Sequence, residues 1–202
     1  SRMVGDIFGA PLAAEGVFAF FMESVFLGIL VFGRNRVSRG VFLLSALLVF
    51  FASHMSGLWI IIANSWMQTP AGFAIEGGRA VLKDFFAAAF NDSTLIRFLH
   101  TIMGGWITGS LFTAGVGSWY ILKNRDLDSA KPLLKIALWI YVAIAILQFG
   151  SGHGHSVQVA KTQPAKMAAF EALWQGQNGA PMSIIGIPDP DQKKTHLEIA
   201  VP

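Results

Sequence analysis

"PLLKIALWIYVAIAILQFG", residues 132–150, is an almost unbroken run of apolar side chains in which Lys135 carries the only charge. A helix needs about 20 apolar residues to cross the hydrocarbon core of a bilayer, which is about 30 Å thick. Pro132 suits the first turn of such a helix, because the N–H that proline lacks would have no partner there. The run therefore predicts a membrane-spanning helix.

Three other runs in the chain have a similar length and character. Of the 202 residues, 53% are hydrophobic and 13% are charged, whereas soluble domains contain about 25% charged residues. The sequence therefore predicts an all-α fold, an integral membrane helical bundle in residues 1–150, followed by an extramembrane loop region in residues 151–202. The four predicted transmembrane helices cover residues 12–33, 40–64, 95–122 and 132–150.

Basic residues gather in two short stretches between the predicted helices. They are Arg34, Arg36 and Arg39 in the first, and Lys123, Arg125, Lys131 and Lys135 in the second. By the positive-inside rule both stretches face the cytoplasm, which places residues 151–202 on the periplasmic side. Topology thereby explains the net charge of +3, so the basic balance does not indicate a nucleic-acid partner.

Segments outside the predicted spans carry their own expectations. "RAVLKDFFAAAF" at 79–90 has apolar residues at helical spacing, which favours a helix lying along the membrane interface. "GSGHGHSVQ" at 150–158 is expected to be a turn-rich exit from the membrane, and "AKMAAFEALW" at 165–174 predicts a short amphipathic helix. The sequence contains no cysteine, which excludes disulfides and thiolate metal sites.

Four acidic or histidine side chains fall inside the predicted spans, namely Glu15, Glu23, His54 and His100. Such groups are functional candidates, because each is costly in a membrane unless it is paired, coordinated or hydrated. Glu15 and Glu23 are eight residues apart, which at about 100° per residue leaves them roughly 80° apart on one broad side of a helix. The pair could pass protons, or the two carboxyls could be structural and hydrogen-bonded to neighbouring helices.

His100 precedes the small-residue pattern of Gly105 and Gly109. Glycines four residues apart permit the close approach of another helix or of a flat ligand. A histidine beside a glycine-lined surface is a common way to hold haem in a helical bundle. The local pattern is equally compatible with a histidine that caps a helix or hydrogen-bonds between helices.

Five stretches of the sequence resemble consecutive signatures of subunit I of the cytochrome bd quinol oxidases, including the cyanide-insensitive branch. They are "VGDIFGAPLAAEG" (4–16), "FFMESVFLGILVFG" (20–33), "SGLWIIIANSWMQTP" (56–70), "RFLHTIMGGWITG" (97–109) and "IIGIPD" (184–189). The resemblance runs in order over essentially the whole chain. It covers the third to sixth helices of the family and the beginning of the family's quinol loop.

The resemblance implies a terminal oxidase of the bacterial cytoplasmic membrane, which oxidises ubiquinol or menaquinol and reduces dioxygen to water. The cofactors that it implies are haem b in low-spin and high-spin forms and haem d. The partners that it implies are quinol, dioxygen, a second oxidase subunit (subunit II), a small accessory subunit and membrane lipid. It does not distinguish ubiquinol from menaquinol.

The resemblance also implies roles for three of the intramembrane residues. The histidine of the family's "HT" motif, here His100, corresponds to the axial ligand of the low-spin haem b. The glutamates of "APLAxEG" and "FFxES", here Glu15 and Glu23, correspond to carboxylates beside the high-spin haems and on the proton route.

Four further residues take roles from the same resemblance. Ser56 and Asn64, in "SGLWIIIAN", match polar residues of the proton route. Lys166 and Glu171, in "KMAAFE", match residues of the quinol loop that affect quinol oxidation.

The sequence also departs from the family pattern. The family's first two helices, with a histidine that ligates a high-spin haem, and a later methionine ligand are absent, so this chain alone is not expected to hold every cofactor. His54 stands where many relatives have asparagine, and it could be a neutral hydrogen-bonding group or a proton relay. His153 and His155 could form a surface metal pair or could simply be solvated.

Two other functions remain compatible with the residues. A b-type cytochrome that only transfers electrons would use His100 but would leave Glu15 and Glu23 without a role. A haem-free component of a proton-coupled transporter would use the two glutamates instead.

Overall fold

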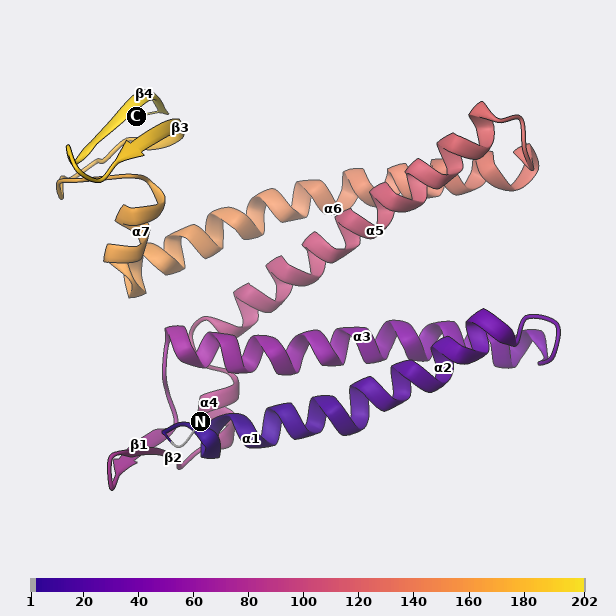
Figure 1. Cartoon of the computed structure of the whole chain (residues 1–202), viewed down its shortest axis with the longest axis horizontal. Coiled ribbons are helices and arrows are strands. Elements are labelled where there is room, and N and C mark those ends of the chain that lie inside the picture. The colour runs from indigo at the N-terminus through magenta and orange to yellow at the C-terminus, as the bar shows by residue number, and fades with distance from the viewer. Residues whose placement is uncertain (1–2, 202) are drawn as a thin grey trace. The chain divides into compact units, whose positions relative to one another are not determined.

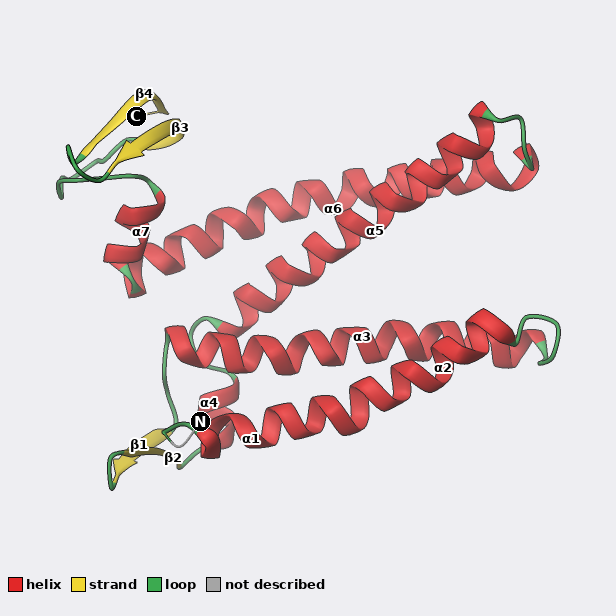
Figure 2. Cartoon of the chain, viewed as in Figure 1, coloured by secondary structure: helices red, strands yellow, loops and turns green. Residues whose placement is uncertain are grey.

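The computed structural model describes residues 3–201, apart from the side chain of Phe18, and most of them are helical (Figures 1 and 2). The chain forms two compact units, Ser1–Gly152 and His153–Pro202. The helices are α1 Gly5–Ala14, the π-helix η1 Glu15–Phe20, α2 Phe21–Phe32, α3 Arg39–Gln68, α4 Phe85–Ala89, α5 Thr94–Leu122, α6 Leu127–Thr162 and α7 Pro164–Phe170. The strands are β1 Phe73–Glu76, β2 Arg79–Leu82, β3 Met182–Asp189 and β4 Lys194–Val201.

The residue range of each of the four predicted spans overlaps a long helical stretch of the structure. Within residues 3–201, three helical stretches are long and apolar enough to cross a membrane, namely Gly5–Phe32, Arg39–Gln68 and Leu127–Thr162. Helix α5 has 29 residues, but its glycine, serine and threonine content makes it less apolar. Large apolar side chains on these helices are exposed, Phe149 at 85% and Phe112 at 75%. The chain is therefore a mostly helical segment of a multi-pass membrane protein.

Local sequence signals set the ends of α2 and α3. Gly33 follows α2, and its N–H donates to the carbonyl of Ile29 at 2.7 Å. Ser38 precedes α3, and its Oγ accepts from the N–H of Val41 at 3.3 Å, as an N-cap does. α3 ends at Gln68, just before Pro70, which disfavours helix at the residue that precedes it.

Helix α6 corrects the expectation of a turn-rich exit at 150–158. Its 36 residues continue through that segment to Thr162, a length of about 54 Å at about 1.5 Å per residue. Helix propagation adds one hydrogen bond for each residue that is fixed, so a helix started by the apolar run can continue through residues of poor propensity. In addition, Ser151 Oγ donates to the carbonyl of Gln148 at 3.0 Å inside the helix.

The predicted interfacial helix at 79–90 is wrong for most of its length. Gly77 and Gly78 have positive φ values of 55° and 75°, the conformation that a tight two-residue hairpin turn requires. The chain consequently reverses there, and β1 pairs antiparallel with β2. Only Phe85–Ala89 is helical, with Asp84 Oδ1 accepting from the N–H of Ala87 at 3.0 Å.

This hairpin packs against the ends of α1 and α3 in a small core. The buried members of the core are Ile7, Trp66, Ala80 and Ala88. The indole N–H of Trp66 donates to the carbonyl of Ala71 at 2.9 Å. The connection between α3 and α5 is thus a folded structure that holds the helix ends together.

Buried polar side chains tie the end of α3 to the start of α5. Asn91 Oδ1 accepts from Thr69 Oγ1 at 2.7 Å and from the backbone N–H of Ser93 at 3.2 Å. Ser93 Oγ donates to the carbonyl of Ser65 at 3.3 Å. A buried polar group without a partner is costly, so these bonds fix how the two helices meet.

The all-α expectation is correct for the long helices and wrong for the second unit, in which β3 and β4 form an antiparallel hairpin. Gly186 and Pro188 obscure the strand pattern of β3, because both residues are unfavourable inside strands. Pro188 is tolerated because a two-stranded sheet consists of edge strands only, where a missing N–H need not break a ladder.

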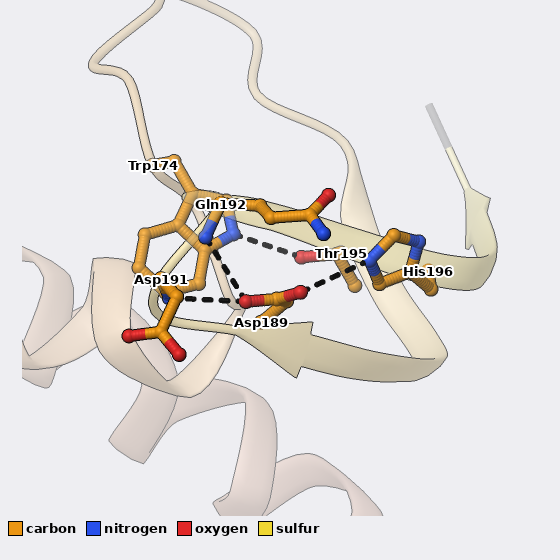
Figure 3. A network of polar contacts seen from close by, with 6 residues as sticks. All are labelled: Trp174, Asp189, Asp191, Gln192, Thr195 and His196. Atoms are coloured by element: carbon orange, nitrogen blue, oxygen red, sulfur yellow. Dashed lines mark hydrogen bonds and ion pairs between the residues drawn. The ribbon is translucent and has the colours of Figure 1, made fainter.

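The turn between β3 and β4 is organised by Asp189 (Figure 3). Its Oδ1 accepts from the N–H groups of Asp191 and Gln192, both at 3.0 Å, and its Oδ2 lies 3.4 Å from His196 Nε2. The N–H of Gln192, followed by contacts with His196 and Asp191, holds the pKa of Asp189 below its ordinary value. Trp174 Nε1 donates to Thr195 Oγ1 at 3.1 Å on the same hairpin.

We expect Asp189→Asn to loosen this turn at neutral pH, because an amide is a weaker acceptor than a carboxylate. A lowered pKa means that the stabilisation is complete above the unfolded value of about 3.9 and is lost as the pH falls through the lower folded value. Hydrogen-exchange mass spectrometry of residues 182–201 should therefore separate the variant from the unaltered protein at pH 6 but not near pH 2. Asp191→Asn is the control, and an equal effect of both changes would contradict the assignment.

Candidate functional site

Glu15 and Ser56, two of the predicted proton-route residues, are in contact. Glu15 begins η1, Ser56 lies in α3, and Ser56 Oγ donates to Glu15 Oε1 at 3.0 Å. Both side chains are half-buried. A hydroxyl can accept one proton and donate another, so this pair connects a carboxylate to α3 by a bond along which a proton can move.

The π-helix changes the predicted relation between Glu15 and Glu23. A π-helix hydrogen-bonds from i to i+5, and one turn of it inside an α-helix accommodates one extra residue. The extra residue turns the following helix back by about 100°, so Glu15 and Glu23 lie about 20° apart around the axis instead of roughly 80°. The two carboxylates are thus nearly in line along one face.

Asn64, the other predicted proton-route residue, is paired with an arginine. Arg97 lies in the first turn of α5, and its Nη1 donates to Asn64 Oδ1 at 2.9 Å. The bond joins α3 to α5 one turn before His100. The structure does not bring Asn64 into hydrogen-bond contact with Ser56 or Glu15 among the described residues.

His54 bridges two groups whose hydrogen-bonding roles are fixed. Its Nδ1 lies 2.7 Å from the carbonyl oxygen of Phe50, which can only accept, and its Nε2 lies 2.9 Å from the indole N–H of Trp106, which can only donate. The proton is therefore on Nδ1 and the lone pair on Nε2. This is the neutral hydrogen-bonding arrangement, and it connects α3 to α5.

His100 meets α6 through both ring nitrogens. Nδ1 lies 3.0 Å from Ser151 Oγ, and Nε2 lies 3.2 Å from the amide nitrogen of Gln148. Gly152 passes the same ring, because a Cβ there would lie 3.4 Å from the ring carbon Cε1. The carbonyl Oε1 of Gln148 is buried without a hydrogen-bond partner.

The glycines that follow His100 line an open groove. Gly105 and Gly109 have nothing within 4 Å of where a Cβ would be. They face a groove of about 640 Å³ whose other walls include Phe50 of α3 and Ala137 and Ile140 of α6. The absence of side chains at Gly105 and Gly109 therefore leaves open space along this face of α5, where another helix or a flat ligand could approach closely.

The predicted quinol residues both belong to the second unit, one in α7 and the other just after it. Lys166 belongs to α7, and its Nζ lies 5.6 Å from the ring centre of Phe170. Glu171 lies beyond the end of α7, and its Oε2 accepts from the N–H of Ser183 at 2.9 Å, at the start of β3.

The possible metal pair of His153 and His155 is not supported. Both residues lie in α6, where a separation of two residues places side chains about 200° apart. Such side chains point to opposite faces and cannot chelate one ion. Among the described residues there is no group of three or more histidine, aspartate or glutamate side chains that could hold a metal.

The profile of the family "Cytochrome bd terminal oxidase subunit I" matches residues 1–202. The chain belongs to this family.

Individual relatives agree with membership of the cytochrome bd family. The chain is 40% identical over 203 residues to "Cytochrome bd ubiquinol oxidase subunit 1" of Bacillus subtilis (strain 168), covering all of this chain and 43% of the relative. It is 38% identical over 208 residues to "Cytochrome bd-II ubiquinol oxidase subunit 1" of Escherichia coli (strain K12), covering all of this chain and 40% of the relative.

A solved bd oxidase has the same fold. The structure of bd oxidase from Geobacillus thermodenitrificans matches with a TM-score of 0.88 and 25% identity, covering all of this chain and 46% of that chain. The chain thus spans less than half the length of these relatives.

The cytochrome bd family implies haem, and the surroundings of His100 fit one axial ligand. Ser151 Oγ has one proton and donates it to the carbonyl of Gln148. Toward His100 it must therefore accept, which puts the ring proton on Nδ1 and leaves the Nε2 lone pair for a metal. Gln148 would have to turn away, and its unpaired Oε1 offers no hydrogen bond that would resist this movement.

Sequence reasoning missed several residues of this cytochrome bd segment. From the sequence, Gln148 is only the end of a span and Ser151 only the start of a loop, and nothing in the apolar pattern indicates Arg97 and Trp106 as partners. The available signal was polarity: a glutamine at the end of an apolar run needs a partner in the membrane. Which residue it meets depends on how α5 and α6 pack.

We expect the bond between His54 and Trp106 to stabilise the contact between α3 and α5. In a double-mutant cycle with His54→Asn and Trp106→Phe, the coupling free energy should be about 1 kcal/mol, the size of an interhelical hydrogen bond. The measurement is unfolding in detergent micelles. Trp139→Phe in place of Trp106→Phe is the control, and additivity of the first pair would show that the bond contributes nothing.

Proposed function

We propose that the chain is a segment of subunit I of a haem-containing terminal oxidase, which oxidises ubiquinol or menaquinol and reduces dioxygen to water. The observation that carries this proposal is the family match over all 202 residues. The side-chain geometry adds support, because Glu15, Ser56 and His100 have hydrogen-bond partners that fit the roles that the family implies.

His100 is the proposed axial ligand of the low-spin haem b. The ring is oriented by α6 and has its lone pair on Nε2, the atom that would bond iron. A haem held there would supply one-electron transfer. The residues of α5 and α6 contribute the ligand atom, its tautomer and its orientation.

Glu15, Glu23, Ser56 and Asn64 are the proposed proton route. The bond between Ser56 and Glu15 and the alignment of Glu23 on the same face support transfer between the first three. Asn64 is held by Arg97, so its proposed part is to orient and hydrogen-bond rather than to exchange a proton. In this reading the glutamates take up protons that oxygen reduction consumes.

Topology and partners complete the proposal. Helix α5 crosses the membrane beside the three more apolar helical stretches, as the third of four spans in chain order, and the basic loops after α2 and α5 face the cytoplasm. Residues 151–202 then lie on the periplasmic side of the bacterial inner membrane, with Lys166 and Glu171 in the quinol loop. Subunit II is the proposed partner, and the high-spin haem b and haem d are the further proposed cofactors.

We expect His100→Ala in the complete oxidase to abolish the low-spin haem b signal and quinol oxidation. Reduced-minus-oxidised spectra measure the first, and oxygen consumption with quinol measures the second. His153→Ala, on the other hand, should keep both. A normal low-spin band in His100→Ala would remove His100 as the ligand, and an unaltered protein without any haem would favour a proton-coupled transporter.

We expect Glu23→Gln to slow oxygen reduction by about 100-fold, because an amide cannot relay protons and positioned proton transfer typically contributes that much or more. Glu15→Gln should slow it at least as much and should also alter the high-spin haem spectrum. The amide at position 15 can still accept from Ser56, so the helices should remain packed. Glu76→Gln, in the β1–β2 hairpin, is the control; wild-type turnover in Glu23→Gln would exclude this carboxylate from the route.

A further inference from the structure

The contact between Ser151 and His100 determines which ring nitrogen of the histidine carries the proton. A serine hydroxyl has one proton, and Ser151 donates it to the carbonyl of Gln148 within α6 at 3.0 Å. The carbonyl can only accept, so this direction is fixed. At 3.0 Å from His100 Nδ1, the same oxygen must accept the ring proton.

The same contacts determine which ring nitrogen of His100 has the lone pair that could bind a metal. With the proton on Nδ1, Nε2 is the basic atom, and the amide N–H of Gln148 at 3.2 Å is a donor to it. Both contacts therefore agree on one tautomer. Gly152 lies against the same ring, because a Cβ there would be in van der Waals contact with Cε1 at 3.4 Å.

An acceptor on the far nitrogen of a ligating histidine changes the ligand electronically as well as sterically. The hydrogen bond draws the Nδ1 proton toward the acceptor, which makes Nε2 a stronger donor. A stronger donor favours the ferric over the ferrous state and therefore lowers the reduction potential. A hydroxyl is a weaker acceptor than a carboxylate, so its effect is intermediate.

We propose that Ser151 is a positioning residue that holds the tautomer of His100 and sets the reduction potential of the low-spin haem. The inference rests on the proposed function, because it requires His100 to bind that haem. It assigns to the segment just after the apolar run a role in tuning electron transfer.

The test is the midpoint potential of the low-spin haem, measured by spectroelectrochemical titration of the complete oxidase. Ser151→Ala removes the acceptor and should raise the potential. Removal of such a partner typically changes metal affinity about tenfold or more, and a tenfold change in the ratio of ferric to ferrous binding corresponds to about 59 mV for one electron. Ser151→Thr retains the hydroxyl and should retain the potential.

Two further variants make the result decisive. Ser151→Cys offers a weaker acceptor and should shift the potential in the same direction as Ser151→Ala, but by less. This variant replaces Ser151→Ala in the test if the alanine variant folds poorly. Ser53→Ala is the matched control, because Ser53 Oγ makes the same kind of bond to a helical carbonyl, that of Val49 at 3.0 Å. Its potential should not change.

Unchanged potentials in both Ser151→Ala and Ser151→Cys would overturn the inference, as would an equal shift in Ser53→Ala or in Ser151→Thr. The outcome is separable from that of the proposed function. If His100→Ala loses the low-spin haem while the Ser151 variants keep the midpoint potential of the unaltered protein, His100 remains the ligand and the role of Ser151 in setting the potential is excluded. If His100→Ala keeps the haem, the proposed function fails at that residue.

Discussion

A polar side chain inside a bilayer has no water to bond with, so each one must find a partner in the protein or in a ligand. In this chain those pairings also connect the helices. Ser56 and Glu15 join α3 to η1, His54 and Trp106 join α3 to α5, and His100 and Ser151 join α5 to α6. The same small set of bonds therefore connects the helices through residues that are proposed to take part in the chemistry.

The long helices were predictable because each has a strong local cause: an apolar run of membrane length, a serine N-cap or a proline stop. The hairpins were not, since β1–β2 depends on two glycines in an uncommon backbone conformation and β3 carries Gly186 and Pro188. The continuation of α6 past Gly150 was missed for a related reason. Residue-by-residue propensity favours turns there, whereas helix growth from the preceding span overrides it.

The candidate site divides in the same way. The ionisable residues could be found from the sequence, because charge inside an apolar run is conspicuous. Their partners could not, because Gln148 and Ser151 lie about fifty residues from His100 and meet it only through the packing of α5 and α6. Contacts between residues so far apart in the sequence cannot be read from local patterns. The family resemblance implies that His100 is a ligand but does not indicate which groups orient its ring. The structure shows that Ser151 and Gln148 contact the ring.

The π-helix Glu15–Phe20 has a consequence for how this segment can vary among relatives. A substitution at Glu23 changes a side chain, whereas a one-residue deletion between Glu15 and Glu23 would convert the segment to ordinary α-helix. The two glutamates would then be seven residues apart and would still lie about 20° apart around the axis. The angle between the two carboxylates therefore does not depend on that single extra residue. A relative with a one-residue gap inside this stretch can keep the same arrangement of the carboxylates with an α-helical turn in place of the π-helical one.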